Sequence, residues 1–221
     1  MSEKIIRLEA SAEWVAERLR DMIVKGDLPP GARLVERRIS ADMNVSRTPV
    51  REALKLLRVD GLIEISMHRG AHVTVYTEKE ARDLFDLISV IEGLAAERLA
   101  ERLAERVLDR LEALHARMLT EYAARNASAY FDTNTTIHDT IVKEAENPIL
   151  VESHRRVMVR ARRGRFMAII DADRWQQAVE EHETLMVALR ARDATRAGAI
   201  WRTHLRHSGD AVATVLRGAA G

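Results

Sequence analysis

The chain has 221 residues and a formal net charge of +1, so it is long enough for two modest domains and too nearly neutral for an indiscriminate polyanion binder. It contains no cysteine, which excludes disulfides, thiolate metal sites and thiol nucleophiles. The start of the chain lacks the apolar core of a signal peptide and no apolar run approaches the length of a membrane span, so we expect a cytoplasmic protein without a membrane partner.

Residues 33 to 59 have the pattern of two short helices joined by a tight turn. We predict a first helix over about Glu36 to Met43 and a left-handed stop at Asn44. A second helix begins near Arg47, after the N-cap Ser46. It has an apolar stripe at spacings of three and four and a separate basic face. The stripe comprises Val50, Ala53, Leu54 and Leu57, and the basic face comprises Arg47, Arg51, Lys55 and Arg58.

One packing face and one basic face suit a helix that enters the major groove of DNA. The helix N-terminus offers unpaired backbone N–H groups to phosphate, to which Arg47 and the Thr48 hydroxyl add. Arg51 lies one turn further in and suits the edge of a guanine base, which a guanidinium contacts through two hydrogen bonds. The alternative at this point is an ordinary helical hairpin with a solvated charged face.

The next segment predicts a two-stranded hairpin. Two apolar runs, 62–65 and 71–75, flank the turn formers His68-Arg69-Gly70. At the tip, Gly70 lets the backbone approach DNA closely and Arg69 suits a narrow minor groove. Helix, turn, helix and hairpin make a winged helix, which favours DNA binding over the solvated-hairpin alternative.

This part of the chain resembles the DNA-binding domain of the GntR family of bacterial transcription regulators, over roughly residues 10 to 76. The shared pattern runs from a first helix that ends in Gly26, through Pro30-Gly31-Arg33-Leu34 and Glu36, to VSRTPVREAL, DGLIE and RGAHV. Arg38, Lys55 and Arg58 are weaker candidates for DNA contacts. The contacts that the resemblance implies are Arg37 on the first helix of the pair, Arg47 and Arg51 on the second, and Arg69 and Gly70 on the wing.

Residues 76–221 form the second predicted domain, which begins with a capping box at Thr77-x-x-Glu80. Apolar residues recur there at helical spacing. We therefore predict a mainly α protein, with a winged helix-turn-helix over residues 1–75 followed by an antiparallel bundle of six or seven helices, since the first helical stretch could be two helices. The predicted helices cover about 78–103, 105–125, 128–146, 148–168, 173–191 and 194–217.

Several polar side chains lie inside the apolar stripes of these helices. Three helices thereby direct imidazoles toward the interior, and imidazole is a common ligand of divalent metals. Because His115 and His154 also fall on apolar faces, periodicity alone does not tell which histidines meet, and a hydrogen-bonded core cluster remains open as an alternative. The inward residues that favour a site are Asn134 and His138, one turn apart, with His182 and His204.

The helical half resembles the C-terminal FCD-type ligand-binding domain of the FadR subfamily of GntR regulators, in its shorter, VanR-like form. Many members bind zinc or nickel through a carboxylate four residues before a histidine plus two later histidines, beside a cavity for a small organic acid. The resemblance implies a divalent metal, zinc or nickel, and a carboxylate effector. It places the metal ligands at Asn134, His138, His182 and His204.

Two positions depart from the subfamily pattern. The carboxylate position is Asn134, whose neutral oxygen leaves the charge of a divalent metal uncompensated and weakens metal retention while favouring an anionic ligand. Ile88 stands four residues before Glu92, where family members often have an arginine that binds the acid. The effector would then be less acidic, or be held by the metal or by another arginine. The sequence does not select an arginine from the candidates on one helix, which are Arg155, Arg156, Arg160, Arg162, Arg163 and Arg165.

These features predict a repressor in which two wing domains, paired through their helical domains, read the halves of a near-palindromic operator on the bacterial nucleoid. A small molecule in the helical domain would control the operator affinity. One alternative is the same regulator with a metal-free, structural histidine cluster. The other is a metalloenzyme, against which no acidic residue has a clear general-base position, although Asp139 and Glu183 adjoin two of the histidines in sequence.

Overall fold

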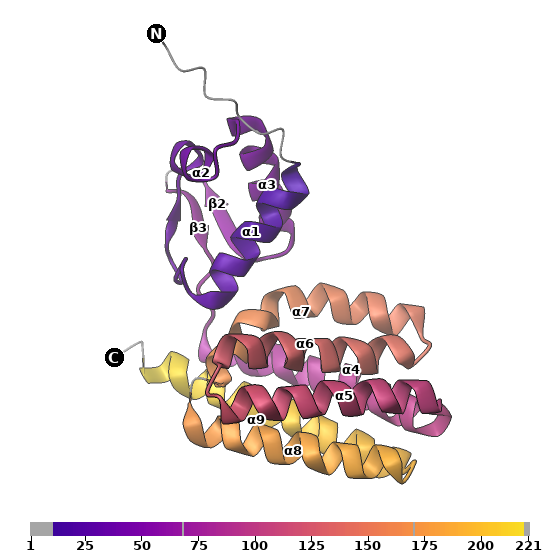
Figure 1. Cartoon of the computed structure of the whole chain (residues 1–221). Helices are drawn as coiled ribbons and strands as arrows, with labels where there is room; N and C mark the ends of the chain where they lie inside the picture. Colours follow the sequence, from indigo (N-terminus) through magenta and orange to yellow (C-terminus); the bar gives the residue numbers. More distant parts are fainter. Residues whose placement is uncertain (1–10, 68, 170, 219–221) are drawn as a thin grey trace. The chain divides into compact units, whose positions relative to one another are not determined.

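The computed structural model describes residues 11–67, 69–169 and 171–218 and is mainly helical (Figure 1). The chain divides into two compact units, Met1–Val75 and Tyr76–Gly221, which we call the N-terminal unit and the helical unit. None of the helices in the described ranges has both the length and the apolar character that crossing a membrane requires.

The N-terminal unit combines three helices with a small antiparallel sheet. The sheet has the order β1-β3-β2, with Ile63 opposite Val73 and Arg33 opposite His72. The predicted two-stranded hairpin is therefore extended by a third strand, which is too short to give an alternating pattern in the sequence. The elements are α1 (Ala12–Lys25), β1 (Arg33–Leu34), α2 (Glu36–Asp42), α3 (Arg47–Val59), β2 (Ile63–Ser66) and β3 (Gly70–Val73).

Local signals explain the helix boundaries of this unit. The Ser11 side chain accepts a hydrogen bond from the Trp14 backbone N–H and so caps α1, which ends at Gly26 with a φ of 92°. Asn44, with a φ of 52°, stops α2 as predicted. Ser46 is the N-cap residue of α3, but its side chain makes no capping hydrogen bond. The apolar stripes of α1 and α3 face each other and form the core of the unit.

The helical unit has six helices among its described residues, and the long first stretch is one helix. The capping box at its start forms in both directions between Thr77 and Glu80. Tyr76, the first residue of the unit, immediately precedes this capping box. The helices are α4 (Glu78–Arg102), α5 (Glu105–Ala123), α6 (Ala127–Glu144), α7 (Pro148–Ala168), α8 (Ala172–Arg190) and α9 (Ala194–Gly218).

Helices α4 and α9 pack along each other, α6, α7 and α8 pack against this pair, and α5 packs against α6 and α8 (Figure 1). Two glycines allow the close approach. A Cβ on Gly93 would lie 2.3 Å from Cγ of Arg202, and one on Gly198 would lie 2.3 Å from Cγ of Glu97. The same two side chains, Arg202 and Glu97, form an ion pair of 2.8 Å between the helices. Helices α6 and α7 contact α4, and α8 contacts α9, so side chains from these helices meet in one interior.

Candidate DNA interface and candidate metal centre

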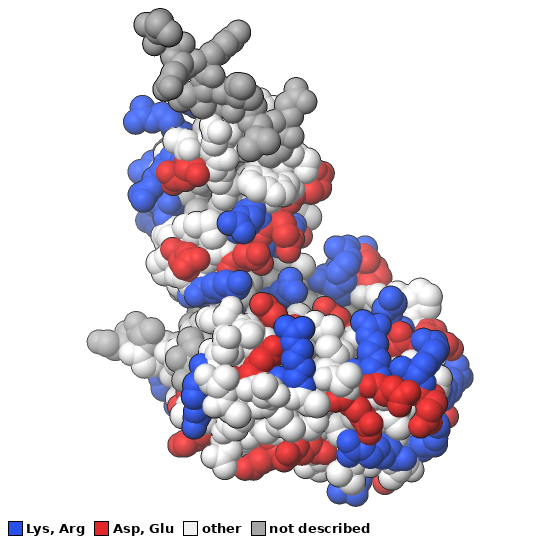
Figure 2. Space-filling model, viewed as in Figure 1, with Lys and Arg blue, Asp and Glu red and all other residues white. Residues whose placement is uncertain are grey.

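Helix α3 separates a buried apolar side from an exposed basic side, as predicted. Val50 and Leu57 are fully buried, whereas Arg47, Thr48 and Arg51 are exposed. On the face shown in Figure 2, Lys and Arg side chains gather along the edge of the N-terminal unit beside α2 and the strands, while both signs of charge alternate on the helical unit. The first turn of α3 therefore presents the Arg47 cation and the backbone N–H groups of a helix N-terminus on one surface.

The other predicted contact residues also lie at or near the surface of this unit. Arg37 on α2 is exposed, and so is Arg69, whose backbone N–H donates to Ser66 Oγ at 3.1 Å in the turn between β2 and β3. Gly70 has a φ of +74°, and a Cβ there would meet open space. The turn residue His68 lies outside the described residues. A glycine is thus required at the tip by backbone conformation and not by crowding.

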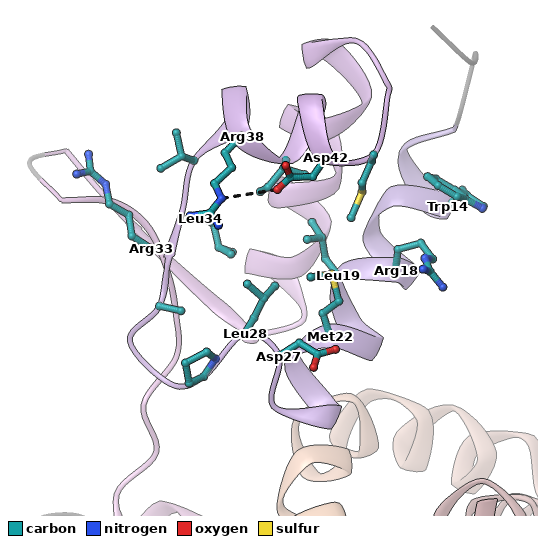
Figure 3. A pocket seen from close by; sticks show the side chains of 15 residues that line it. Trp14, Arg18, Leu19, Met22, Asp27, Leu28, Arg33, Leu34, Arg38 and Asp42 are labelled. Atoms are coloured by element: carbon teal, nitrogen blue, oxygen red, sulfur yellow. Dashed lines mark ion pairs between the residues drawn. The ribbon is translucent and has the colours of Figure 1, made fainter. Parts of the chain in front are cut away.

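The two arginines of α2 differ in their surroundings. Arg38 pairs with Asp42 at 3.7 Å on the rim of a pocket of about 740 Å³ between α1, the segment after it and α2 (Figure 3). Trp14 on α1 also lines this pocket and is 47% exposed. Among the residues that the structure describes, Arg37 has no ion pair. Arg37 stays the stronger predicted DNA contact of the two and Arg38 the weaker one.

Arg51 is held by a carboxylate that the sequence did not single out for this role. Its Nε and Nη2 atoms donate to the two oxygens of Glu36 at 3.3 Å each, and its side chain remains 61% exposed. Glu36 was part of the family pattern, but the contact spans 15 positions and two helices. The pair fixes the direction of the Arg51 guanidinium and places a negative charge beside it.

We expect Glu36→Gln to bind all DNA sequences more tightly and to discriminate less between them. The change removes a negative charge next to phosphate and frees Arg51, while the exposed ion pair itself adds little stability. Affinity for scrambled DNA should rise a few-fold, by more than affinity for the operator. Fluorescence anisotropy at one salt concentration measures both. The matched control is Glu52→Gln, which removes a negative charge from α3 and the contact to Lys55 at 2.8 Å but leaves the hydrogen bonds between Glu36 and Arg51 in place. Unchanged discrimination would show that Glu36 does not orient Arg51.

In the helical unit, three of the candidate histidines meet. His138 on α6, His182 on α8 and His204 on α9 each direct a ring nitrogen to one point, and these three atoms lie within 4.8 Å of one another. The three residues are at most 3% exposed. Of the other two inward histidines, His154 contacts Glu92 and His115 stays outside the cluster. The structure thus decides which of the five histidines converge.

Two carboxylates lie behind the imidazoles. Glu92 on α4 accepts from His138 Nδ1 at 2.5 Å and from Trp201 Nε1 at 3.0 Å. Glu181 on α8 accepts from His204 Nδ1 at 2.6 Å. Each carboxylate therefore fixes the tautomer in which Nδ1 carries the proton, which leaves the other nitrogen as the electron-pair donor. Nothing in the sequence pointed to Glu181, and Glu92 was only the position from which Ile88 is counted.

Several polar atoms of this interior have no hydrogen-bond partner among the described residues. They include Nε2 of His138, Nε2 of His182 and Oδ1 of Asn134, which lies one turn before His138 and is 4% exposed. Buried polar atoms in native proteins are nearly always partnered, so these atoms are available to a bound ligand, an ion or ordered water. Neutral imidazoles with carboxylates behind them are a donor set that suits a divalent transition metal.

Burial keeps these histidines neutral. Desolvation, followed by the positive charge of Arg165, lowers the pKa of His138 to about 3. Desolvation is also the largest cause that lowers the pKa of His182 and of His204. Desolvation opposes ionisation of Glu92, yet its contacts with His138 and His154 bring its pKa well below the usual range. At neutral pH the cluster therefore presents uncharged nitrogens, the form that binds metal.

We expect the metal-free protein to lose stability as the pH falls from 6.5 to 5. In this window the unfolded chain protonates His138 and His182 and the folded chain does not, so each of the two lowers the free energy of unfolding by up to about 1.4 kcal/mol per pH unit. The window lies above the ordinary glutamate range, so carboxylates contribute little. Urea unfolding of chelator-treated protein, followed by tryptophan fluorescence, measures the free energy of unfolding at each pH. Its slope against pH should be shallower in His182→Gln than in the wild type. Equal slopes would mean that His182 titrates normally.

Comparisons with known proteins agree with both halves of the chain. The family model described as "Bacterial regulatory proteins, gntR family" matches residues 11–73, and the model of the FCD domain matches residues 83–207. The chain is 33% identical over 183 residues to the "Probable D-xylose utilization operon transcriptional repressor" of Paenarthrobacter nicotinovorans, covering 81% of this chain and 80% of that protein.

Two further relatives extend the comparison. The chain is 29% identical over 149 residues to the "Gluconate operon transcriptional repressor" of Bacillus licheniformis, covering 67% of this chain and 61% of that protein. The solved structure of Escherichia coli McbR/YncC superposes with a TM-score of 0.80 over 97% of this chain and all of that one, at 20% identity. The last likeness supports the fold of the whole chain.

Proposed function

This chain belongs to the GntR family of bacterial regulatory proteins and carries an FCD domain, and on that premise we propose that it is a transcriptional repressor whose operator affinity is controlled by a small organic acid. The relatives are transcriptional regulators, so the chain is a regulator and not an enzyme, and the metalloenzyme alternative is set aside.

The main support for DNA binding is helix α3, which has a buried apolar side and an exposed basic side. Its buried stripe anchors the helix to α1, and its exposed first turn offers Arg47 and Thr48 to phosphate. Arg51, one turn further along, reaches for a base edge in the major groove. Arg69 and Gly70 at the wing would follow the adjacent minor groove.

A homodimer is supported by an exposed apolar stripe on α4. Leu87 is 50% and Val90 is 55% exposed, and the half-buried Leu84, Ile91 and Leu94 continue the stripe at spacings of three and four. This spacing suits packing against the same helix of a second copy. Two reading heads related by a two-fold axis would recognise a near-palindromic operator with half-sites about one helical turn apart.

The interior of the helical unit supports a metal and an effector. His138, His182 and His204 would hold a divalent ion such as zinc or nickel, with the amide oxygen of Asn134 as a fourth donor. A bound ion supplies a Lewis-acidic position to which a carboxylate can bind. Glu92 and Glu181 orient the imidazoles for that role. An acid bound there would alter the packing of the helices and shift the dimer between geometries that fit or miss the operator spacing.

Selection from randomised duplex DNA tests the proposal. We expect an enriched near-palindromic motif, a footprint of two protected blocks about one helical turn apart, and an affinity that falls steeply with salt. A promoter that carries the motif should be repressed by the protein in a transcription assay. Recovery of no enriched motif would contradict sequence-specific binding, and a single protected block would contradict the paired reading heads.

A further inference from the structure

Helix α7 directs one of its many arginines into the interior of the helical unit. Arg165 is 4% exposed, and within the described ranges neither of its Nη atoms has a hydrogen-bond partner. Its neighbours on the helix behave differently. Arg155 and Arg156 pair at the surface with Glu152 at 2.9 and 2.7 Å, and Arg160 donates to the Tyr76 hydroxyl at 3.4 Å. Arg165 is therefore the cation of this series that is both buried and unsatisfied.

Arg165 lies within electrostatic reach of the histidine cluster. Its charge is among the causes, after burial, that lower the pKa of His138 and of His204. It also lies within electrostatic reach of Glu92, although Glu92 already accepts from His138, His154 and Trp201. A buried guanidinium that forms no hydrogen bond through its Nη atoms lowers the stability of the folded state, because water is lost and nothing replaces it.

A second buried arginine reaches the same interior from α8. Arg174 donates through Nη2 to Ser208 Oγ at 2.8 Å and pairs with Glu181 at 3.1 Å, while its Nε and Nη1 have no partner among the described residues. The charges of Glu92 and Glu181 thus balance those of Arg165 and Arg174. A divalent ion at the histidines would leave two positive charges, since Asn134 adds none.

We propose that Arg165 is the anion-binding residue of the effector site, and that the effector is a small organic acid with two anionic groups, one on the Arg165 guanidinium and the other at the histidine cluster. The inference rests on the proposed function and names its ligand class. Arg165 supplies from α7 the guanidinium that Ile88 on α4 cannot supply. A carboxylate matches the two unpartnered Nη atoms with two parallel hydrogen bonds. Two anionic groups also cancel the charge that a divalent ion would leave.

Thermal denaturation of the full-length protein with malonate, succinate and acetate tests this assignment. We expect the two dicarboxylates to raise the melting temperature of the wild type and acetate to have little effect. Arg165→Met should abolish the shift. It should also raise the melting temperature without acid by about 3 °C or more, because it removes an unsatisfied charge from the interior. Arg162→Met, a half-buried arginine three positions earlier on α7, should do neither.

Three results would overturn the proposal: no shift with either dicarboxylate, an undiminished shift in Arg165→Met, or a lower melting temperature of that variant without acid, which would mean that Arg165 is structural. An acetate shift equal to that of succinate would overturn the two-anion ligand class. Operator binding is measured in parallel. A dicarboxylate shift that depends on Arg165 but leaves operator affinity unchanged would support the binding residue and contradict the proposed regulatory function.

Discussion

Arg51→Ala should remove most of the preference of the protein for its operator over scrambled DNA. A guanidinium that contacts guanine with two hydrogen bonds accounts for about a 5- to 150-fold preference, and alanine makes no such contact. The helix itself should stay in place, because Val50 and Leu57 on its other side remain fully buried. Fluorescence anisotropy with operator and scrambled duplexes at one salt concentration measures the ratio of the two affinities.

Lys55→Ala is the matched control for this change. Lys55 is also exposed on α3, one turn beyond Arg51, and pairs with Glu52 at 2.8 Å. Lys55→Ala should weaken binding to both duplexes by no more than a similar small factor. The ratio of the operator affinity to the scrambled-DNA affinity should stay unchanged, since contacts to phosphate carry no sequence information. A wild-type ratio in Arg51→Ala would remove Arg51 from base recognition and leave it a role in contacting phosphate.

The N-terminal unit was predictable because its signals are local. A left-handed Asn44, an N-cap at Ser46 and an apolar stripe on the following helix each lie within a few residues of the boundary that they set. The strand Arg33–Leu34 was missed, because two residues cannot show an alternating pattern and its pairing with β3 is a contact distant in sequence. The Glu36–Arg51 pair was missed for the same reason, because it joins two helices and such contacts leave no local pattern in the sequence.

The metal-site candidates were only partly predictable. Helical periodicity showed that five histidines point inward but not which of them converge, because convergence depends on the packing of α6, α8 and α9. One of the arginines that the sequence left undecided did carry a distinguishing signal. Arg165 falls in register with the buried Met158, Ala161 and Ala168 on α7, at spacings of three and four, and that register marks it as inward. Glu181 left none, since it adjoins His182 in an acidic run and only the fold turns it toward His204.

His182→Gln should empty the proposed metal site. Protein purified without a nickel column should contain zinc or nickel by mass spectrometry, and chelator should lower its melting temperature. The variant should lack the metal and show no response to chelator. His115→Gln removes a buried histidine of α5 outside the cluster. This variant should still contain the metal, and chelator should still lower its melting temperature. Wild-type protein that holds no metal and ignores chelator would favour the metal-free structural cluster.

Asn134→Asp should act on the metal and the acid in opposite directions. A carboxylate at this position adds a charged oxygen ligand, so metal affinity should rise by at least about tenfold. Losing a residue that only orients a ligand already lowers metal affinity by about that factor. The same negative charge would offset part of the charge of the ion and repel an anionic effector, so succinate should bind more weakly. Competition with a chromogenic chelator measures the first affinity, and calorimetry on the metal-loaded variant measures the second. If both affinities rose together, the neutral amide would not be what makes the site receptive to an acid, and Arg165 would have to account for the anion alone.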